Sequence, residues 1–493
     1  MGFIQIKRVH PMENEYSFLR PFSEAGQRFV FNGKSLAMVQ VDDDISDFLN
    51  KVKIHGIDQA RVIFGESRGK ECLETVLRQI KEMMRLDSTL QMPHHPSIGT
   101  NSSVDIHEVY LSLTTECNLS CRYCYAERIE TSAPRFMTKE TAQQSVEFLI
   151  SRSSASHPLT IVLWGGEPLL NMNVLEFVLR FTSGQMQRLK RSVLFATTTN
   201  GTLLTPEASS LLARYRVAVN VSLDGDEQCH DAYRVFRSGM GSFSSISRHL
   251  PSYLANTQSY FPEFVPRARM TVTHRTSQHL FENYRAIWDL GIPIVWCKEV
   301  DWVAGDPEYV LNEEDFSALD DQFSSLRKFI LEEFDSPRAR RYYPQIWWDL
   351  HGIHQRRAKR YTCGSGFRSV SINTDGSLSS CYHLFDRLEF RCGHVSDDFI
   401  PITCYQPEDR LVDNMPACNH CDIKYLCSGG CVAKAIAHSG CPTIPSTADC
   451  RMSRVYQDHC LRLYASLMVS PQASTIRQLL SISPMHFAGV AHA

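Results

Sequence analysis

The chain has 493 residues, of which 43% are hydrophobic and 21% are charged, as is typical of a folded globular protein with about two or three domains. Its formal net charge of −3 gives no electrostatic reason to expect a nucleic-acid partner. The amino terminus lacks the apolar core of a signal peptide, and no run of about 18 apolar residues would cross a membrane, so we expect a cytoplasmic protein.

The first 105 residues predict a small module without a cysteine cluster. Apolar residues on both sides of Asn32-Gly33 predict a β-hairpin with a tight turn. Residues 45–52 and 71–84 carry apolar side chains three and four positions apart, which predicts two amphipathic helices. A winged-helix-like module fits this order, and a generic capping subdomain would show the same pattern.

From about residue 106, short β-rich segments alternate with helical ones. Such alternation is typical of a parallel sheet covered by helices. Thr205 and Pro206 suit the start of one of these helices, and Gly291 suits the end of another. Six such units are too few for a closed eight-stranded barrel. The predicted strands cover residues 109–113, 159–164, 193–198, 217–223, 267–272 and 292–296.

The segment after the first predicted strand carries Cys117, Cys121 and Cys124 in the spacing C-x3-C-x2-C. Three thiolates at this spacing suit three corners of an iron–sulfur cubane and leave the fourth iron without a protein ligand. Because most electron-transfer clusters use four cysteines, an open iron indicates a different task. A zinc site completed by a distant fourth residue is the alternative.

Short motifs follow the next three strands, at the edge where parallel barrels place their chemistry. Gly165-Gly166-Glu167-Pro168 follows the second strand, where two glycines let the backbone approach a ligand closely. Asn200 follows the third strand, and Ser222 and Asp224 belong to the SLDG segment after the fourth. Each motif is weak alone, since such segments usually form turns, and their order along the sheet makes them informative. His230, Asp231 and Arg234 follow directly downstream.

A second cysteine-rich region follows residues 311–362, which predict a helical bridge that begins after Asn312. Seventeen cysteines in a reducing compartment favour metal binding over disulfides. A zinc ribbon would account for this region in isolation. Its spacing is C-x12-G-x4-C, then C-x2-C-x5-C-x3-C, then one more cysteine, and the residues are Cys363, Cys381, Cys418, Cys421, Cys427, Cys431 and Cys450.

The sequence CNLSCRYCY around the first triplet resembles the signature of the radical S-adenosylmethionine (SAM) enzymes. The spacing of the seven later cysteines resembles that of a SPASM domain. The likeness covers residues 106 to about 455 and is to peptide maturases related to anaerobic sulfatase-maturing enzymes. It implies an α/β fold, a partial (β/α)6 TIM-like barrel followed by a cysteine-rich iron–sulfur domain. The amino-terminal module looks like the leader-peptide recognition element of such enzymes. We expect domains at residues 1–105, 106–310, 311–362 and 363–460, and a tail without a readable role at 461–493.

The resemblance implies SAM and three [4Fe–4S] clusters as cofactors. The first cysteine triplet would bind the cluster whose open iron chelates SAM. One auxiliary cluster would use Cys418, Cys421, Cys427 and Cys450, and the other would use Cys363, Cys381 and Cys431. The implied SAM contacts are Tyr123 near the adenine, Gly165, Gly166 and Glu167 at the amino group, Ser222 and Arg234 at the ribose or carboxylate, and Asn200 and Asp224.

The implied activity is the modification of a ribosomally made precursor peptide. A 5′-deoxyadenosyl radical would abstract hydrogen from the peptide, and a thioether or carbon–carbon crosslink would form while the auxiliary clusters accept the remaining electron or template the bond. The implied partners are a precursor peptide with a leader sequence and an electron donor such as flavodoxin or ferredoxin. Neither a nucleic acid nor a membrane is expected as a partner.

Two departures from the sulfatase-maturing pattern count against formylglycine formation. No cysteine lies shortly upstream of Cys363, and Tyr382 follows Cys381 where those relatives tend to carry Asp. A formylglycine-forming maturase and a small-molecule radical SAM dehydrogenase are the alternatives, with a zinc-binding regulatory protein as a distant one. We expect the cluster at Cys363, Cys381 and Cys431 to keep an open or exchangeable iron. Its fourth ligand would otherwise be Cys297, Cys392, Cys404 or Cys441.

Overall fold

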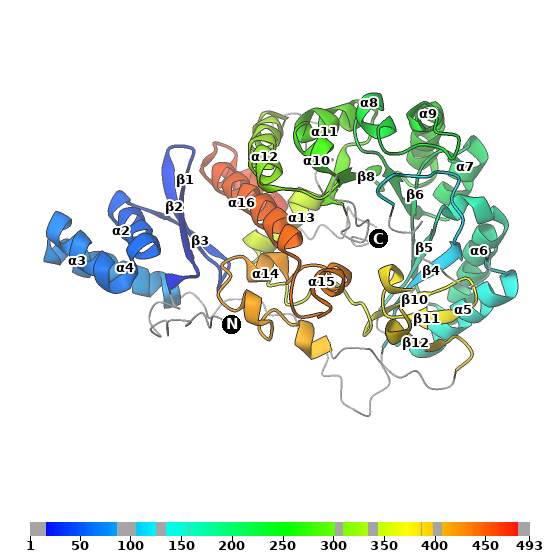
Figure 1. Cartoon of the computed structure of the whole chain (residues 1–493), viewed down its shortest axis with the longest axis horizontal. Helices are drawn as coiled ribbons and strands as arrows, with labels where there is room; N and C mark the ends of the chain where they lie inside the picture. The colour runs from blue at the N-terminus through cyan, green and yellow to red at the C-terminus, as the bar shows by residue number, and fades with distance from the viewer. Residues whose placement is uncertain are drawn as a thin grey trace, which may run out of the picture.

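A nine-stranded sheet and its helices form the larger part of the molecule, on the right in Figure 1. The structure is a computed structural model, and it describes residues 16–85, 105–124, 135–155, 157–300, 309–333, 344–385, 387–397 and 407–481. Within these ranges, the strands of the sheet run in the order β12-β11-β10-β4-β5-β6-β7-β8-β9. A separate three-stranded sheet with its own helices forms the amino-terminal module, in blue. No helix among these residues is both long and apolar enough to cross a membrane.

The six strands from β4 to β9 are parallel and follow one another in sequence order, as the alternation of β-rich and helical segments predicts. Their apolar side chains pack against the surrounding helices in the main core. The strands are β4 (Glu108–Thr114), β5 (Leu159–Gly165), β6 (Val193–Thr199), β7 (Val217–Ser222), β8 (Arg267–Val272) and β9 (Ile294–Glu299). The helices between them are α5 (Lys139–Arg152), α6 (Met172–Leu189), α7 (Pro206–Arg214), α8 (Glu227–Asp231), α9 (Phe243–Tyr260), α10 (His274–Ser277) and α11 (Leu280–Asp289).

The cysteine-rich region extends this sheet, a pairing that the sequence did not reveal. Strand β10 (Ser369–Ile372) runs parallel to β4 on the edge opposite β5. Strands β11 (Ser377–Ser379) and β12 (Arg391–His394) follow it in antiparallel order. Gly376, the glycine of the C-x12-G-x4-C spacing, has a φ of +88° in the turn between β10 and β11.

The amino-terminal module contains the predicted hairpin and both predicted helices. Strands β2 (Gln27–Asn32) and β3 (Ala37–Val41) pair in antiparallel fashion. Asp42 caps the first helix by accepting the Ile45 N–H at 2.9 Å. The sequence missed strand β1 (Leu19–Glu24), which contains Pro21, and one helix of three. The helices are α2 (Asp43–His55), α3 (Ile57–Arg68) and α4 (Lys70–Arg85).

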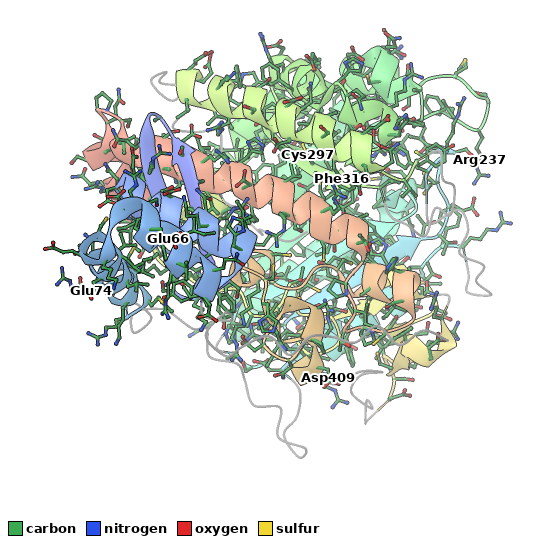
Figure 2. All side chains as sticks on the ribbon, turned by 60° about the vertical axis from the view of Figure 1, so that its left-hand side comes forward. Glu66, Glu74, Arg237, Cys297, Phe316 and Asp409 are labelled. Atoms are coloured by element: carbon green, nitrogen blue, oxygen red, sulfur yellow. The ribbon has the colours of Figure 1, made fainter. Side chains whose placement is uncertain are left out.

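The module is docked on the carboxyl-terminal helices through its edge strand β1. Arg20 pairs with Asp458 at 2.5 Å, and Glu24 pairs with Arg327. One face of the sheet packs on the module's own helices, and the other packs on carboxyl-terminal residues such as Val412 and Leu461. Figure 2 shows helix α16 running past the sheet, with Glu66 on α3 and Glu74 on α4.

Two helices correct the expectation of a tail without a readable role from residue 461. Helix α16 (Thr447–Val469) continues across position 460, and α17 (Ala473–Ser481) packs on α13 (Pro344–His354), where His351 Nδ1 lies 2.7 Å from the Leu480 carbonyl oxygen. Residues 482–493 lie outside the described residues. The other helices of this part are α12 (Glu313–Glu333), α14 (Lys424–Cys427) and α15 (Val432–Ser439).

Candidate active site

The first cysteine triplet lies in the loop directly after β4, at the carboxyl end of the first parallel strand. The Cys124 N–H donates to the Cys121 carbonyl at 2.8 Å, which closes a tight turn. The Cys117 sulfur accepts N–H groups from Leu119 (3.4 Å) and from the Asn200 side chain (3.8 Å). An apolar cluster surrounds the three thiols and includes Leu119, Tyr123, Tyr233, Val300 and Tyr309.

These thiols fit an iron–sulfur cluster better than a single zinc ion. Burial, the largest cause, raises the pKa of Cys117 to about 11 and that of Cys121 to about 12, and the charges of the neighbouring thiolates act in the same direction, so the three are within electrostatic reach. Zinc binds thiolates at about 2.3 Å, which would bring their sulfur atoms to about 3.8 Å from one another. Among the described residues, no three thiols lie mutually within 4.8 Å. A cubane binds each thiolate through a different iron and therefore suits a wider set.

The GGEP segment packs against the cysteine loop through its backbone. The Gly166 N–H donates to the Thr114 carbonyl and the Glu167 N–H donates to the Glu116 carbonyl, both at 2.9 Å. A Cβ added at Gly165, where φ is +143°, would lie 2.2 Å from the Thr114 oxygen. At Gly166 it would lie 2.3 Å from the Glu116 oxygen. The two glycines therefore permit a close approach of β5 to the loop that carries the cysteines.

Gly166→Ala is expected to displace the cysteine loop, because the new Cβ would meet a backbone oxygen and not the end of a flexible side chain. We expect the rate of SAM cleavage to 5′-deoxyadenosine to fall by about 100-fold, as small misplacements of reacting groups typically cost. The matched control is Gly184→Ala in α6, where no atom lies within 4 Å of the added Cβ. A wild-type cleavage rate in Gly166→Ala would contradict the expectation.

Glu167 is fully buried and joins the GGEP segment to the end of β6. Its carboxylate accepts the Thr199 hydroxyl (2.7 Å), the Asn200 N–H (2.7 Å) and the Leu169 N–H (3.1 Å). Burial raises the pKa of Glu167 to about 7, and these three donors act in the opposite direction. The Asn200 side chain donates to the Asn118 amide oxygen at 2.8 Å, in the cysteine loop. Glu167 and Asn200, both predicted to contact SAM, therefore form hydrogen bonds within the protein.

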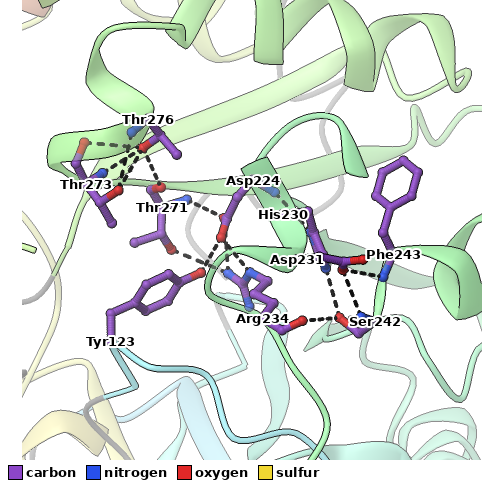
Figure 3. A network of polar contacts seen from close by, with 10 residues as sticks. All are labelled: Tyr123, Asp224, His230, Asp231, Arg234, Ser242, Phe243, Thr271, Thr273 and Thr276. Atoms are coloured by element: carbon purple, nitrogen blue, oxygen red, sulfur yellow. Dashed lines mark hydrogen bonds and ion pairs between the residues drawn. The ribbon is translucent and has the colours of Figure 1, made fainter. Parts of the chain in front are cut away.

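Asp224 is the centre of a buried polar network (Figure 3). Its carboxylate accepts Arg234 Nε–H (2.9 Å), the Thr271 N–H (2.9 Å) and the Tyr123 hydroxyl. The Arg234 guanidinium lies 5.4 Å from the centre of the Tyr123 ring, in a cation–π contact. The structure therefore brings three predicted SAM contacts together and pairs them with one another. Ser222 lies nearby in the sequence, buried at the last position of β7.

His230 and Asp231 fix the loop that carries Asp224. Burial lowers the pKa of His230 to about 3, so the ring is neutral. Its Nδ1 accepts the Asp224 N–H (3.4 Å) and its Nε2–H is directed at the Ser242 hydroxyl (2.9 Å), which donates to the Arg234 carbonyl (2.8 Å). Asp231 accepts two backbone N–H groups where α9 begins (Figure 3). The spacing of His230, Asp231 and Arg234 therefore serves to hold this loop in place.

Four cysteines of the later region gather around one point. The Cys421 N–H donates to the Cys418 carbonyl at 3.0 Å, which closes the turn between them. Burial, the largest cause, raises the pKa of Cys450 to about 12, and the charges of Cys427, Cys418 and Cys421 act in the same direction. Arg454 donates to the Cys421 sulfur at 3.4 Å. These four are the residues expected to hold one auxiliary cluster.

The three other cysteines lie in a second common region. Cys381 and Cys431 pack against the same apolar cluster, which includes Leu384 and Phe390. The residue before Cys363, Thr362, donates its hydroxyl to the Gly430 carbonyl at 2.7 Å, directly before Cys431. Among the candidates for a fourth ligand, Cys404 lies outside the described residues.

An aromatic group connects this second region to the GGEP segment. The Tyr382 ring, directly after Cys381, lies 4.4 Å from the Trp164 ring and 4.9 Å from the Tyr110 ring, measured between centres. Trp164 directly precedes Gly165 at the end of β5. The sequence offered no signal for this contact, because the residues are more than two hundred positions apart.

A buried ion cluster joins β9 to the cysteine-rich region. Lys434 of α15 pairs with the Glu299 carboxylate at the end of β9. Asp449, which directly precedes one of the four gathered cysteines, accepts the Cys431 N–H at 2.7 Å. Burial raises the pKa of Glu299, whereas for Asp449 the charges of Lys434 and Lys298 and its hydrogen bonds together outweigh burial and hold the pKa at about 2. A cavity of about 10 Å³ lies between these three side chains and Val300, which also packs on the first triplet.

Comparison with known proteins supports the family resemblance seen in the sequence. Residues 111–240 match the radical SAM superfamily. The chain is 33% identical to the radical SAM cyclopropyl synthase TigE of Paramaledivibacter caminithermalis over 25% of its length, which spans only 28% of that protein. It is 23% identical to the serine-type anaerobic sulfatase-maturating enzyme of Klebsiella aerogenes, over 67% of this chain and 81% of that protein. It is 25% identical to the subtilosin biosynthesis protein AlbA of Bacillus subtilis, over 65% of this chain and 64% of that protein.

A solved structure confirms the fold. The structure titled native anSMEcpe with bound AdoMet and Cp18Cys peptide is similar with a TM-score of 0.59 and 17% sequence identity. The likeness covers 74% of this chain and 99% of that one. The radical SAM fold, an α/β fold with a parallel sheet, is therefore the fold of this chain.

Proposed function

The chain is a radical SAM enzyme by its domain at residues 111–240, and from this premise we propose that it installs a thioether or carbon–carbon crosslink on a ribosomally made precursor peptide. The supporting observation is that distant cysteine regions meet the carboxyl edge of one parallel sheet. The first triplet follows β4, Tyr382 contacts Trp164 at the end of β5, and Lys434 contacts Glu299 at the end of β9. The similarity to AlbA, named as a bacteriocin biosynthesis protein, supports a peptide as substrate.

We assign the [4Fe–4S] cluster of the family to the first triplet, Cys117, Cys121 and Cys124. When bound, this cluster and SAM supply the radical that abstracts hydrogen from the substrate. The chain's own contribution is to position and enclose the reactants. The network around Asp224 fixes Tyr123 and Arg234, and the apolar cluster around the thiols keeps water from the site.

The later cysteines are proposed to hold two auxiliary clusters, with the ligand sets predicted from the sequence. Their thiols fall into two groups, one whose members lie within electrostatic reach of one another and one in which Cys381 and Cys431 pack on the same apolar cluster, as cluster ligands require. The auxiliary clusters would accept the electron left on the substrate after hydrogen abstraction. A flavodoxin- or ferredoxin-type protein would supply the electron that starts each turnover.

The amino-terminal module is proposed to bind the leader of the precursor peptide. Its strand order β1-β2-β3 leaves β3 at the edge, whereas β1 is docked on α16. An extended peptide binds such an edge by adding one more strand, with affinity from main-chain hydrogen bonds. The outer edge of β3 is therefore the proposed leader site.

Proline substitutions at Val39 and Gln40 test the leader site, because successive strand N–H groups point to opposite edges. One proline removes an N–H bonded to β2 and destabilises the module, and the other removes an N–H from the outer edge. We expect the variant that loses only the outer-edge N–H, recognised by a Tm close to that of the wild type, to bind a labelled precursor peptide about tenfold more weakly. This is the worth of one lost hydrogen bond. Equal affinity in both variants and wild type, measured by fluorescence anisotropy, would exclude this edge.

The activity itself is tested with anaerobically reconstituted protein, SAM, dithionite and the peptide encoded by a short reading frame beside the gene. We expect 5′-deoxyadenosine to form and the peptide to lose a pair of hydrogen atoms by mass spectrometry. A sulfatase-derived peptide serves as the second arm, because the similarity to the Klebsiella enzyme favours formylglycine formation as the second candidate. Oxidation of that peptide, with the precursor unchanged, would overturn the crosslinking proposal.

A further inference from the structure

Asp105, His107 and His157 form a compact group at the amino ends of β4 and β5. One ligand atom from each residue lies within 4.8 Å of those of the other two. The imidazole rings of the two histidines are stacked, with centres 5.0 Å apart and an interplanar angle of 18°. Asp105 Oδ2 lies 3.7 Å from His157 Nδ1. Strand β4 has seven residues, or about 20 Å, so the group lies far from the cysteine loop at the other end of the strand.

The backbone on both sides of the group is held by the sheet. The His107 N–H donates to the Arg368 carbonyl at 3.1 Å, and the His107 carbonyl accepts the Thr160 N–H at 2.8 Å. The Asp105 carboxylate accepts the Ser154 N–H (2.7 Å) and hydroxyl (2.8 Å), and such hydrogen bonds hold a metal-binding carboxylate in a fixed orientation. The group therefore joins the segments before β4 and β5 in a fixed arrangement.

One ring nitrogen of this group has no hydrogen-bond partner in the described part of the protein. His107 Nδ1 is buried and has no hydrogen-bond partner. The nearby positive charge of Arg368 is directed to the Tyr361 and Phe367 rings, at 5.5 and 5.8 Å from their centres.

We propose that Asp105, His107 and His157 bind one divalent transition-metal ion, and that this ion is zinc. Two imidazoles and one carboxylate suit zinc, cobalt or nickel, whereas calcium and magnesium prefer oxygen ligands and cuprous ion prefers sulfur. Water would fill the remaining coordination position. The His157 side chain is 56% exposed, so a small adjustment toward the ion meets little packing beyond its stacking on the His107 ring. The role of the ion is to fasten two strands of the barrel at the end opposite the cysteine sites.

The test is zinc binding by the full-length protein after its iron–sulfur clusters have been loaded anaerobically. Protein is exposed to zinc, passed through gel filtration and analysed for zinc and iron, and its Tm is measured with and without zinc. We expect one zinc per chain in addition to the iron, and a higher Tm with zinc. In His157→Ala the zinc affinity should fall by at least about tenfold. Losing a residue that only orients a metal ligand already costs this much, and His157 is proposed as a ligand itself.

The matched control is His55→Ala, which removes an exposed histidine at the end of α2. It should keep the zinc and the Tm shift of the wild type. His157→Ala is expected to fold, because the side chain is exposed. Equal zinc retention in His157→Ala and wild type, or no zinc in the wild type at full iron loading, would overturn the proposal. Neither result bears on SAM cleavage, so the metal site and the proposed function fail or stand separately.

Discussion

Replacing Cys117, Cys121 and Cys124 together with alanine is expected to remove one [4Fe–4S] cluster and abolish SAM cleavage. Iron content should fall from about twelve to about eight per chain, as expected if three cubanes are present and only one uses these thiols. The auxiliary clusters should persist, because their cysteines belong to separate groups in the carboxyl-terminal region. Iron and sulfide analysis, visible absorption and a 5′-deoxyadenosine assay on anaerobically reconstituted protein measure the effect.

The control for this experiment is Cys72→Ala. Cys72 lies in α4 of the amino-terminal module, next to Asp44 at 3.5 Å and apart from every predicted ligand set. This variant should keep the full iron content and the full rate of SAM cleavage. Stoichiometric zinc and no iron chromophore in the wild type would contradict the radical assignment and favour a zinc-binding regulator. Unchanged iron in the triple variant would show that the triplet holds no cluster.

Most of the parallel sheet could be predicted from the sequence because its signals are local. Apolar residues at Val109, Leu111 and Leu113 mark a strand by their alternation, and all three are buried in the main core. Thr205 and Pro206 fix the start of α7 by capping, which the structure confirms. Strand β1 was missed because it contains polar residues and a proline. It is held in the sheet partly by its contact with α16, which no local pattern in the sequence indicates.

The candidate site was predictable in its residues and less so in its contacts. The spacing of the first triplet predicted its set because these cysteines belong to one loop, whereas the two later sets combine cysteines from distant segments and were implied only by the family resemblance. The pairing of Arg234 with Asp224 was not predictable, because both motifs were interpreted only as SAM contacts. The contact of Tyr382 with Trp164 depends on β10 joining β4, a long-range pairing without any local sequence signal. Chain folding, and not the motif, decides which polar groups face one another.

The ion cluster at the junction of the cysteine regions leads to the second large prediction. Lys434→Met should destabilise the protein by about 3–5 kcal/mol, because it leaves the buried Glu299 and Asp449 carboxylates without their cation. Lys434 has a side-chain exposure of 9% and Glu299 one of 3%, so water replaces little of the lost interaction. The auxiliary clusters should also load less completely, since Asp449 holds the Cys431 N–H.

A double variant, Lys434→Met with Glu299→Leu, separates charge from packing. Replacing both partners of a buried ion pair by apolar side chains is often close to neutral, so the double variant should recover much of the stability that the single variant loses. Arg451→Met is the surface control, because its pair with Glu313 is 39% and 79% exposed and should contribute at most about 1 kcal/mol. Thermal unfolding and iron content of the loaded proteins give both quantities. If Lys434→Met unfolds no earlier than Arg451→Met, the barrel and the cysteine-rich region are joined by packing alone, and the ion cluster does not set their arrangement.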